Sequence, residues 1–472
     1  MPARIDHSLR APTGPAGAGE KPTPRAARRP ADPAISATVI ALHHGYRVAG
    51  GEERAAAQLA DLAEARLGER VAWLRRDSTR ITGGDAARGL IAGGIGARQV
   101  TEGIAACGAD LVHAHNLFPT FGPAALRAAR DAGAAVVVHL HNYRLVCAVA
   151  TTVRDGRDCT ECHRGWPVPG VRHRCRGSLP EVLAYAAALP RWQHDVVDLA
   201  DVVVVPSSAA RSRLAQLGLR LPADRVHVVG GVATEIATTS TASTGRFALV
   251  VTRLAPEKDL LTAIDACRRA HLPLVIAGDG PERAALEAYA GPPSVRPVAP
   301  PPVRHVPYGG PPSKPPPKQR LVSAEDPFEI LGDEVVLELD TPPVMRGNTI
   351  FVGRVGDRAL AALRRGARVG LTPSVAHETF GLSALESMSA ALPTIGSAVG
   401  ALPELLGDDR VVPPGDPAAL AARITEVAGS DAAGAAAAAR ARDLAGPDHV
   451  ATRLAAAYAA ARERAAARRA YR

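Results

Sequence analysis

The feature that most constrains the fold is a regular alternation, starting at Ala37, between short β-branched segments and Ala- and Leu-rich segments of helical length. The short segments are unbroken apolar runs, which are typical of parallel sheets covered on both faces by helices. They form two series: residues 38–42, 71–74, 111–115, 135–140, 202–206 and 226–229, then 248–252, 274–277, 350–353, 369–373, 393–396 and 410–412. The sequence therefore predicts an α/β protein with two doubly wound, Rossmann-like domains.

A polar segment, TTSTAST at residues 238–244, separates the two series. We expect an N-terminal domain over residues 37–240 and a C-terminal domain over residues 245–448. The chain length of 472 residues fits this division, because domains usually hold roughly 100–200 residues.

Three segments differ from these domains in composition. Residues 1–36 are rich in Pro, Ala, Gly and Arg and are predicted to form a disordered tail. A Pro-rich insert at about residues 291–345 interrupts the C-terminal domain. Within it, residues 291–317 contain 12 prolines, which favours an extended polyproline conformation, and residues 333–340 (DEVVLELD) are a candidate hairpin arm. Residues 449–472 predict a basic C-terminal helix whose last turns are solvated.

The formal net charge of +9 comes from such segments and not from the body of the chain. Residues 1–36, 291–320 and 451–472 carry net charges of +3, +5 and +5, so the remainder is mildly acidic. The chain has only 6 Phe, 3 Trp and 7 Tyr, too few to suggest a surface that stacks bases. We therefore expect no nucleic-acid partner. The basic ends are interpreted as solvated, or as held near an anionic membrane surface.

Unbroken apolar stretches are short throughout the sequence. The longest, residues 182–189 and 454–461, are far below the ~20 residues that a membrane-spanning helix needs. The first 36 residues contain no apolar stretch typical of a secretory signal. We therefore expect a cytoplasmic protein with reduced thiols, with peripheral membrane association left open.

The segment PSVAHETFGLSALE, residues 373–386, is the most informative motif. An apolar strand ends at Pro373, and a short loop carrying Glu378 leads into a helix on which Glu386 sits in the second turn. The free amides at the helix start, from Thr379, Phe380, Gly381 and Leu382, form a candidate phosphate site. Two glutamates eight residues apart are by themselves more often an ordinary, solvated helix start.

Three further features favour a ligand site. Arg253 and Lys258, in VTRLAPEKD, follow a strand of the same domain and could present two cations to a diphosphate. Glycines in AGDGPE and in HHGYRVAGGEER permit tight turns after two other strands. These glycines are Gly278, Gly280, Gly50 and Gly51.

Together with the dipeptide His141-Asn142 at a strand end, this order of motifs resembles glycosyltransferase family 4. The resemblance runs from about residue 38 to 460 and omits the tail, the last basic residues and the Pro-rich insert. It implies the two-domain GT-B fold and a retaining transfer from a nucleotide-diphosphate sugar. A UDP- or GDP-sugar is the expected donor, and no cofactor is expected for catalysis. The acceptor class stays open: a glycan, a lipid-linked molecule or a small molecule.

The resemblance also implies a role for each matching residue. Glu386 would bind the nucleotide ribose, and Glu378 would lie beside the transferred sugar. Arg253 and Lys258 would neutralise the diphosphate of the leaving nucleotide. His141 would face the donor sugar, and the loop of Gly50 and Gly51 would close over the phosphates from the opposite domain.

Some positions fall outside this pattern. Asp259 and Ala391 stand where the family commonly has glycine. Other histidines are expected to be strand-end or partly buried residues without a role: His43, His44, His113, His115 and His139.

Four of the six cysteines lie in one Arg- and Gly-rich loop and are spaced Cys147-x11-Cys159-x2-Cys162-x12-Cys175. This spacing fits a tetrahedral structural zinc site, with His163 and His173 as replacement ligands. Disulfides or free thiols are the alternatives. The other two, Cys107 and Cys267, fit small core residues.

Two other functions remain open from the sequence. An enzyme of another class on the same architecture, such as a nucleotide-sugar epimerase or a phosphorylase, would share the donor-site residues. A non-catalytic, zinc-stapled scaffold would use the Pro-rich insert to recruit a partner.

Overall fold

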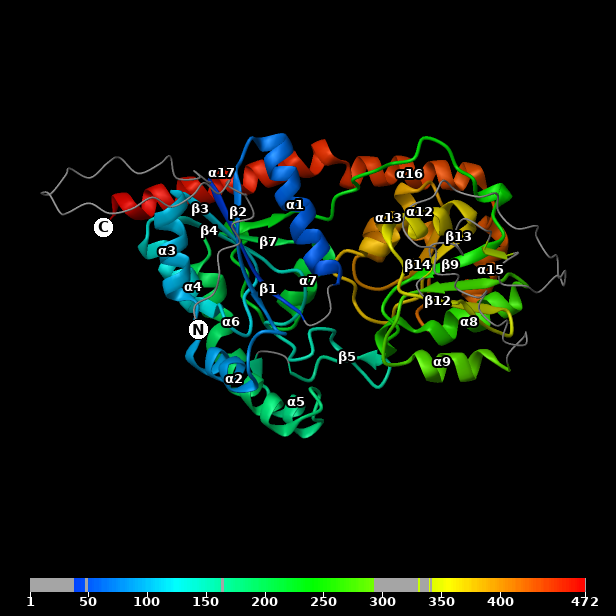
Figure 1. Ribbon diagram of the computed structural model, residues 1–472, viewed down its shortest axis with the longest axis horizontal. Coiled ribbons are helices and arrows are strands. Elements are labelled where there is room, and N and C mark those ends of the chain that lie inside the picture. Colours follow the sequence, from blue (N-terminus) through cyan, green and yellow to red (C-terminus); the bar gives the residue numbers. More distant parts are fainter. Residues whose placement is uncertain are drawn as a thin grey trace, which may run out of the picture.

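Two parallel sheets, each inside its own α/β domain, form the centres of this computed structural model (Figure 1). The structure describes residues 38–46, 50–162, 165–292, 330–331, 339 and 342–471. The predicted tail and most of the Pro-rich insert, including most of the candidate arm, lie outside these residues. The GT-B-like arrangement of two doubly wound domains expected from the sequence is confirmed.

The N-terminal sheet has the strand order β2-β1-β3-β4-β7-β8, and all its neighbours are parallel. The strand order reverses between β1 and β3, where a doubly wound sheet opens a crevice at the carboxyl ends of its strands. Its elements are β1 (Val39–Gly45), α1 (Gly51–Leu67), β2 (Val71–Asp77), α2 (Gly83–Ala92), α3 (Ala97–Cys107), β3 (Leu111–Asn116), α4 (Gly122–Asp131), β4 (Ala135–His139), α5 (Val168–Arg172), α6 (Leu179–Leu199), β7 (Val202–Val205), α7 (Ser208–Gln216) and β8 (Val226–Val228).

The C-terminal sheet has the order β11-β12-β10-β9-β13-β14-β15, parallel except for the antiparallel edge strand β11. Without this edge it is the Rossmann order, and the order reverses between β9 and β13. Its elements are β9 (Phe247–Val251), α8 (Leu260–Arg269), β10 (Leu274–Ala277), α9 (Arg283–Ala290), β11 (Val344–Arg346), β12 (Thr349–Gly353), α12 (Asp357–Gly366), β13 (Ala367–Thr372), α13 (Leu382–Ser389), β14 (Thr394–Ser397), α14 (Leu402–Leu406), β15 (Val411–Val412), α15 (Pro417–Val427) and α16 (Asp431–Ala445).

The strands read as unbroken apolar runs because their alternate residues enter two different cores. In β3, Leu111 packs into one apolar cluster and Val112 packs into another on the opposite face of the sheet. Every residue of β3, β4 and β7 is buried. Burial on both faces is what the sequence pattern predicted for these strands.

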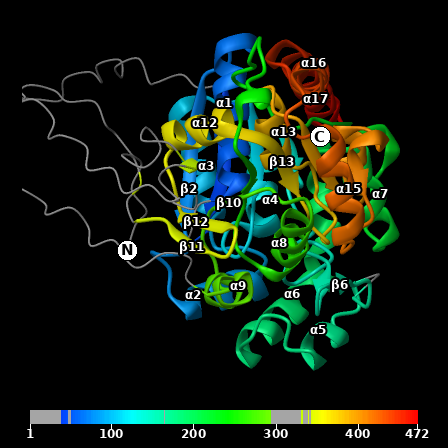
Figure 2. The ribbon, with the colours of Figure 1, turned by 90° about the vertical axis from the view of Figure 1, so that its right-hand side faces the viewer.

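The last helix, α17 (Pro447–Ala470), crosses back and packs on the N-terminal domain. Both ribbon views show it continuing from α16 along one edge of the molecule (Figures 1 and 2). Val450, Leu454 and Tyr458 are buried against the sheet in a cluster that includes Val39 and Leu111. The chain's C-terminal helix therefore completes the core of its first domain.

The prediction of a C-terminal helix is right, and the prediction of solvated last turns holds in part: residues 466, 467, 469 and 470 are exposed, whereas the residues that face the N-terminal domain are buried or paired. Ala465 is fully buried, and Arg462 pairs with Glu69 at 2.7 Å and with Asp110 at 2.9 Å. Arg468 pairs with buried Asp201. The basic residues of this helix are held by partners on the N-terminal domain because the helix lies flat on that domain.

A two-stranded hairpin, β5 (Val153–Arg154) and β6 (Arg157–Asp158), lies in the cysteine-rich loop and was not predicted. The loop with α5 projects at the edge of the molecule opposite to α16 and α17 (Figure 2). Among the described helices, none combines the length and the hydropathy that a membrane span requires.

Candidate active site

The loop after β9 carries the two predicted cations. Arg253 pairs with Glu257, and Lys258 ends a short 3-10 turn (Pro256–Lys258). Gly278 and Gly280, in the loop after β10, pack against the backbone of this loop. An added Cβ on Gly278 would lie 1.8 Å from the Thr252 carbonyl oxygen, and one on Gly280 would lie 2.2 Å from the Leu254 carbonyl oxygen. The glycines therefore let the two loops pack backbone to backbone.

Lys258 and Glu378 meet at the point where the strand order reverses. The Lys258 ammonium donates to Glu378 Oε1 at 2.5 Å, and the Ser374 hydroxyl donates to the same oxygen at 2.7 Å. Burial alone would raise the pKa of Glu378, but the charge and hydrogen bonds of Lys258 and Ser374 hold it below its usual value. The predicted Glu378 and Lys258 are thus brought together, whereas Arg253 is turned to Glu257.

The helix that follows Glu378, α13, begins at Leu382 and not at Thr379 as predicted. Gly381 adopts a left-handed conformation, with φ of +95°, which a β-carbon would strain. The Phe380 ring packs against Gly230, in the interdomain segment that follows β8 (residues 229–246), where an added Cβ would be 2.4 Å away. Side chains of this turn therefore brace the interdomain segment, and its amides remain the candidate phosphate site.

Glu386, in the second turn of α13, has partners on both carboxylate oxygens. Arg54 of α1 donates to Oε1 at 2.7 Å, and Arg364 of α12 donates to Oε2. Arg54 comes from the N-terminal domain, so this ion pair spans the two domains. Sequence reasoning missed both arginines.

The start of α1 faces the start of α13, as expected for a loop closing from the opposite domain. An added Cβ on Gly51 would lie 3.3 Å from Leu382 Cδ1. Glu53 accepts from the amides of Tyr46 at 3.0 Å and Gly50 at 2.8 Å. These two hydrogen bonds hold the backbone of the loop that precedes α1.

His141 lies where the two domains touch. The Thr379 hydroxyl donates to the His141 carbonyl oxygen at 2.8 Å, and the Ser207 hydroxyl donates to the Thr379 carbonyl oxygen at 2.7 Å. Burial, reinforced by His113 and His43, lowers the pKa of His141 to about 3. The imidazole is therefore neutral at physiological pH.

Four of the five histidines expected to have no role, His43, His113, His115 and His139, form a buried cluster with His141. The fifth, His44, bonds to the Thr120 and Ser78 hydroxyls instead. His115 Nδ1 lies 2.9 Å from His141 Nε2, and the rings of His139 and His141 stack at 3.9 Å. His113 bonds to the Tyr458 hydroxyl of α17 at 2.9 Å. The sequence predicts the five histidines at strand ends or partly buried. His113 lies inside β3 rather than at its end, and all five are buried.

A buried polar network supports the segment after His141. Asn142 donates to Glu52 Oε2 at 2.7 Å, and Arg144 donates to the Tyr46 hydroxyl at 3.0 Å. Burial raises the pKa of Glu52 even though Arg144 and the hydrogen bonds oppose it. The Asn of the His-Asn dipeptide therefore ties strand β4 to the start of α1.

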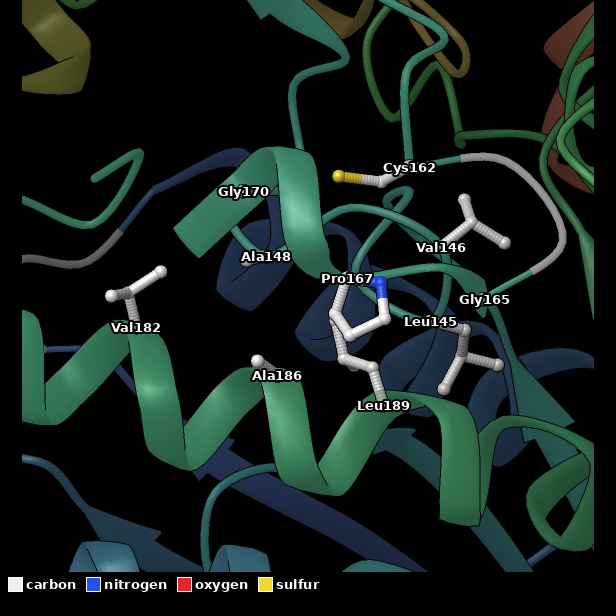
Figure 3. Close-up of a pocket in the computed structure, with 10 residues that line it drawn as sticks. All are labelled: Leu145, Val146, Ala148, Cys162, Gly165, Pro167, Gly170, Val182, Ala186 and Leu189. Carbon is white, nitrogen blue, oxygen red and sulfur yellow. The ribbon is translucent and has the colours of Figure 1, made fainter. Parts of the chain in front are cut away.

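The cysteine-rich loop holds its four cysteines as half-buried free thiols. Burial raises the pKa of Cys162 to about 11, and the neighbouring thiols of Cys147, Cys159 and Cys175 add to the rise. A cavity of about 20 Å³ lies beneath the loop, lined by apolar residues with the Cys162 sulfur near its rim (Figure 3). It has room for about one water molecule, so it is not a sugar site.

Comparison with known proteins fits this geometry. The family model described as Glycosyltransferase Family 4 matches residues 49–232, and that described as Glycosyl transferases group 1 matches residues 320–430. HepE from Anabaena, solved in complex with UDP, has a TM-score of 0.52 at 15% identity and covers 89% of this chain and 98% of its own. Glycosyltransferase family models thus match both domains, and the chain has the GT-B fold. Its N-terminal domain is that of glycosyltransferase family 4.

Curated relatives match over shorter stretches. Phosphatidyl-myo-inositol mannosyltransferase from Mycobacterium leprae is 40% identical over 74 residues, 15% of this chain and 20% of the relative. O-antigen chain mannosyltransferase B from Escherichia coli is 37% identical over 95 residues, 20% of this chain and 25% of the relative. The matches span a quarter or less of either relative.

Proposed function

We propose that the protein is a retaining glycosyltransferase that moves a sugar from a nucleoside-diphosphate donor to an acceptor held mainly by its N-terminal domain. The observation that carries this proposal is the Lys258–Glu378 pair at the crevice of a Rossmann-order sheet. Ligands bind such sheets at the carboxyl ends of the strands, where the order reverses.

The donor diphosphate would lie at Lys258 and the amides before α13. Negative charge grows on the leaving diphosphate as the bond to the sugar breaks, and a cation fixed beside it lowers the barrier. Lys258 is already oriented by Glu378, so little reorganisation is required. Arg253 would exchange Glu257 for a phosphate oxygen, since its side chain is more than half exposed.

The sugar would sit between Glu378 and His141. Glu378 keeps its charge at neutral pH because Lys258 and Ser374 stabilise the carboxylate, so it can accept hydrogen bonds from sugar hydroxyls. His141 is neutral and acts as a hydrogen-bonding group, not as a charged acid. Glu386 would bind the ribose after releasing Arg54.

The nucleotide is proposed to be UDP or GDP. UDP is the ligand of the similar HepE structure, and both curated relatives are mannosyltransferases, so UDP- and GDP-sugars including mannose belong in the first screen. The predicted membrane role of the C-terminal arginines is not part of the proposal, because Arg462 and Arg468 are paired within the protein.

Calorimetry with UDP and GDP, followed by assays with the corresponding sugars, tests the proposal. We expect micromolar to millimolar nucleotide binding, slow donor hydrolysis and, with an acceptor, a product with the anomeric configuration of the donor. Glu386→Ala should weaken nucleotide binding at least tenfold, whereas Glu102→Ala on α3 should not. Absence of both binding and hydrolysis with every donor would refute the proposal. An unchanged-mass isomer of the donor would indicate an epimerase instead.

A further inference from the structure

Exposed apolar side chains gather in one part of the N-terminal domain. Nine large hydrophobic side chains are exposed in the described part of the chain, and four of them lie within residues 166–183. These four are Trp166, Val168, Leu179 and Leu183, with exposed fractions of 47% to 63%. Single exposed hydrophobic residues are common on any protein, but several at one place mark an interaction surface.

The first half of α6 is apolar on two faces, although the protein covers only one of them. Val182 faces the interior and is 1% exposed, whereas its neighbour Leu183 is 49% exposed. Leu179 and Leu183 are four residues apart, so they lie on the same face of the helix. The only charged residue in the sequence from 179 to 190 is Glu181. A helix face that meets water normally carries charged or polar residues, so this face is suited to an apolar partner.

The short helix α5 and the loop before it lie beside this part of α6. Pro167 and Gly170 line one side of the small cavity beneath the cysteine-rich loop, and α6 lines the other side with residues such as Val182 (Figure 3). These contacts hold α5 on α6. Trp166 and Val168 flank Pro167 in the sequence and are exposed. Both segments therefore present apolar side chains outside their common contact.

Two arginines without an acidic partner accompany these side chains. Residues 166–183 contain three arginines and one acidic residue, Glu181, which pairs with Arg176 at 3.1 Å. Arg172 and Arg174 are exposed, and neither is paired with an acidic group in the described part of the chain. Arg172 lies four residues after Val168 on α5, so it shares the face of that side chain.

The exposed apolar side chains and the unpaired arginines form a surface at the outer edge of the molecule. In both ribbon views α5 lies at the lower edge of the N-terminal domain, away from α16 and α17 (Figures 1 and 2). A surface that projects in this way can contact a flat partner. We call it the α5–α6 face, and it consists of Trp166, Val168, Arg172, Arg174, Leu179 and Leu183.

We propose that the α5–α6 face docks the protein on the surface of an anionic lipid membrane. Tryptophan and arginine favour the boundary between lipid headgroups and acyl chains, because each joins an apolar body to a polar tip. The four apolar side chains would enter this boundary, and the two arginines would contact lipid phosphates. Docking does not depend on which reaction the protein catalyses.

A membrane fits this face better than a protein partner does. A standard interface between two proteins uses about 20–30 residues on each side, far more than the α5–α6 face has. A helical or proline-rich peptide binds in a groove, whereas the cavity beneath this face is about 20 Å³ and holds no side chain. A symmetric dimer through the face would bring four arginines together, which like-charge repulsion disfavours.

Sedimentation of the full-length protein with lipid vesicles tests the proposal. We expect binding to mixed vesicles of phosphatidylglycerol and phosphatidylcholine, and about tenfold weaker binding to vesicles of phosphatidylcholine alone. Arg172→Gln combined with Arg174→Gln should weaken binding to the mixed vesicles by about tenfold. The matched control, Arg220→Gln combined with Arg269→Gln, removes two exposed arginines elsewhere on the protein and should bind like the wild type.

The apolar side chains of the face require a separate variant. Trp166→Ser combined with Leu183→Ser should weaken vesicle binding by about tenfold, because both side chains would lose their burial in lipid. Leu261→Ser combined with Leu444→Ser removes two exposed leucines of the C-terminal domain and should leave vesicle binding unchanged. Because all four side chains are exposed, both variants should melt at the temperature of the wild type.

Other results would overturn the docking face. A protein that binds neither kind of vesicle would refute it. Equal binding by the wild type and both face variants would also refute it and would assign membrane contact to another basic segment. A wild-type dimer in analytical ultracentrifugation that W166S/L183S converts to a monomer would make the face an interface between two copies. Vesicle binding needs no donor, so failure of the proposed function would be seen separately, in calorimetry with UDP and GDP.

Discussion

Arg54 Nη1 lies 2.7 Å from Glu386 Oε1, joining the first helix of one domain to the helix of the other that is proposed to bind the nucleotide. The carboxylate proposed to bind the ribose thus already has protein partners. Arg54→Ala should free Oε1 of Glu386, with Oε2 still bonded to Arg364, and tighten UDP or GDP binding up to about fivefold, because a partly exposed ion pair contributes about 0.2–1 kcal/mol. Calorimetric titration measures this.

The matched control is Arg98→Ala, which removes an arginine from an exposed ion pair with Glu102 on α3. It should leave nucleotide binding unchanged. If Arg54→Ala instead abolished binding, Arg54 would be a ligand of the donor and not its competitor.

The Lys258–Glu378 pair should contribute to stability as well as to transfer. Both side chains are mostly buried, and removing Lys258 leaves a carboxylate without its charge partner. Lys258→Ala should lower the free energy of unfolding by about 1–3 kcal/mol and abolish transfer. Lys258→Ala combined with Glu378→Gln should recover part of the stability but none of the activity. Equal stability loss in the single and double variants would show that the two residues do not interact.

The stability of the protein should depend on pH through Glu53. Burial would raise the pKa of Glu53, but the His43 imidazole, whose Nε2 lies 3.6 Å from Glu53 Oε1, and hydrogen bonds from the amides of Tyr46 and Gly50 lower it from 4.5 to about 2. A lowered pKa stabilises the fold above pH 4.5, and this stabilisation is lost as the pH falls toward 2. Glu53→Gln should therefore cost about 2 kcal/mol at pH 7, and the difference should narrow below pH 4.5.

Urea unfolding at pH 7, 5 and 3.5 measures this difference. Glu102→Gln, in the exposed pair on α3, serves as the control and should cost little at any pH. A constant difference across the pH range would mean that Glu53 acts by its shape and not by its charge.

Substitution of Ala391 tests whether the backbone at this position has the left-handed conformation. It follows α13 with φ of +54°, whereas its neighbour Ala390 has φ of −79°. Ala391→Gly should be close to neutral, because relief of about 1–2 kcal/mol of left-handed strain offsets the lost methyl burial and the added chain entropy. Ala390→Gly should destabilise by about 1 kcal/mol. Equal melting temperatures for the two variants would contradict the left-handed assignment.

The sequence predicted the strands well because most of them, such as β3, β4 and β7, are apolar runs buried on two faces, which is a local pattern. It placed Lys258 and Glu378 after two strands that turn out to be neighbours in the sheet, and the structure brings these two side chains together. The roles of Lys258, Glu378 and Glu386 stay predictions. The sequence could not show that Asp259 and Ala391 occupy left-handed positions, where φ is +46° and +54°. The type of a residue alone does not determine its backbone dihedral angles. Asp259 compensates by capping α8, accepting from the Thr262 hydroxyl at 2.6 Å.

The sequence also could not indicate ion pairs between residues that are far apart in the chain. Arg54 and Glu386 are 332 residues apart, and nothing local to either indicates the other. The C-terminal arginines read as a solvated basic tail because Glu69, Asp110 and Asp201, which neutralise them, lie more than 260 residues earlier. Long-range pairing of this kind becomes visible only once the domains are folded.

The crossing of α17 onto the first sheet has a consequence for biosynthesis. Strand β1 emerges from the ribosome early, but the apolar face that Leu454 and Tyr458 cover stays open until residues 447–470 have been made. At about 5–20 residues per second, that wait is on the order of 20–80 seconds. During this time the nascent N-terminal domain exposes the apolar face of its sheet to solvent. We therefore expect chaperones to bind the nascent chain before α17 docks.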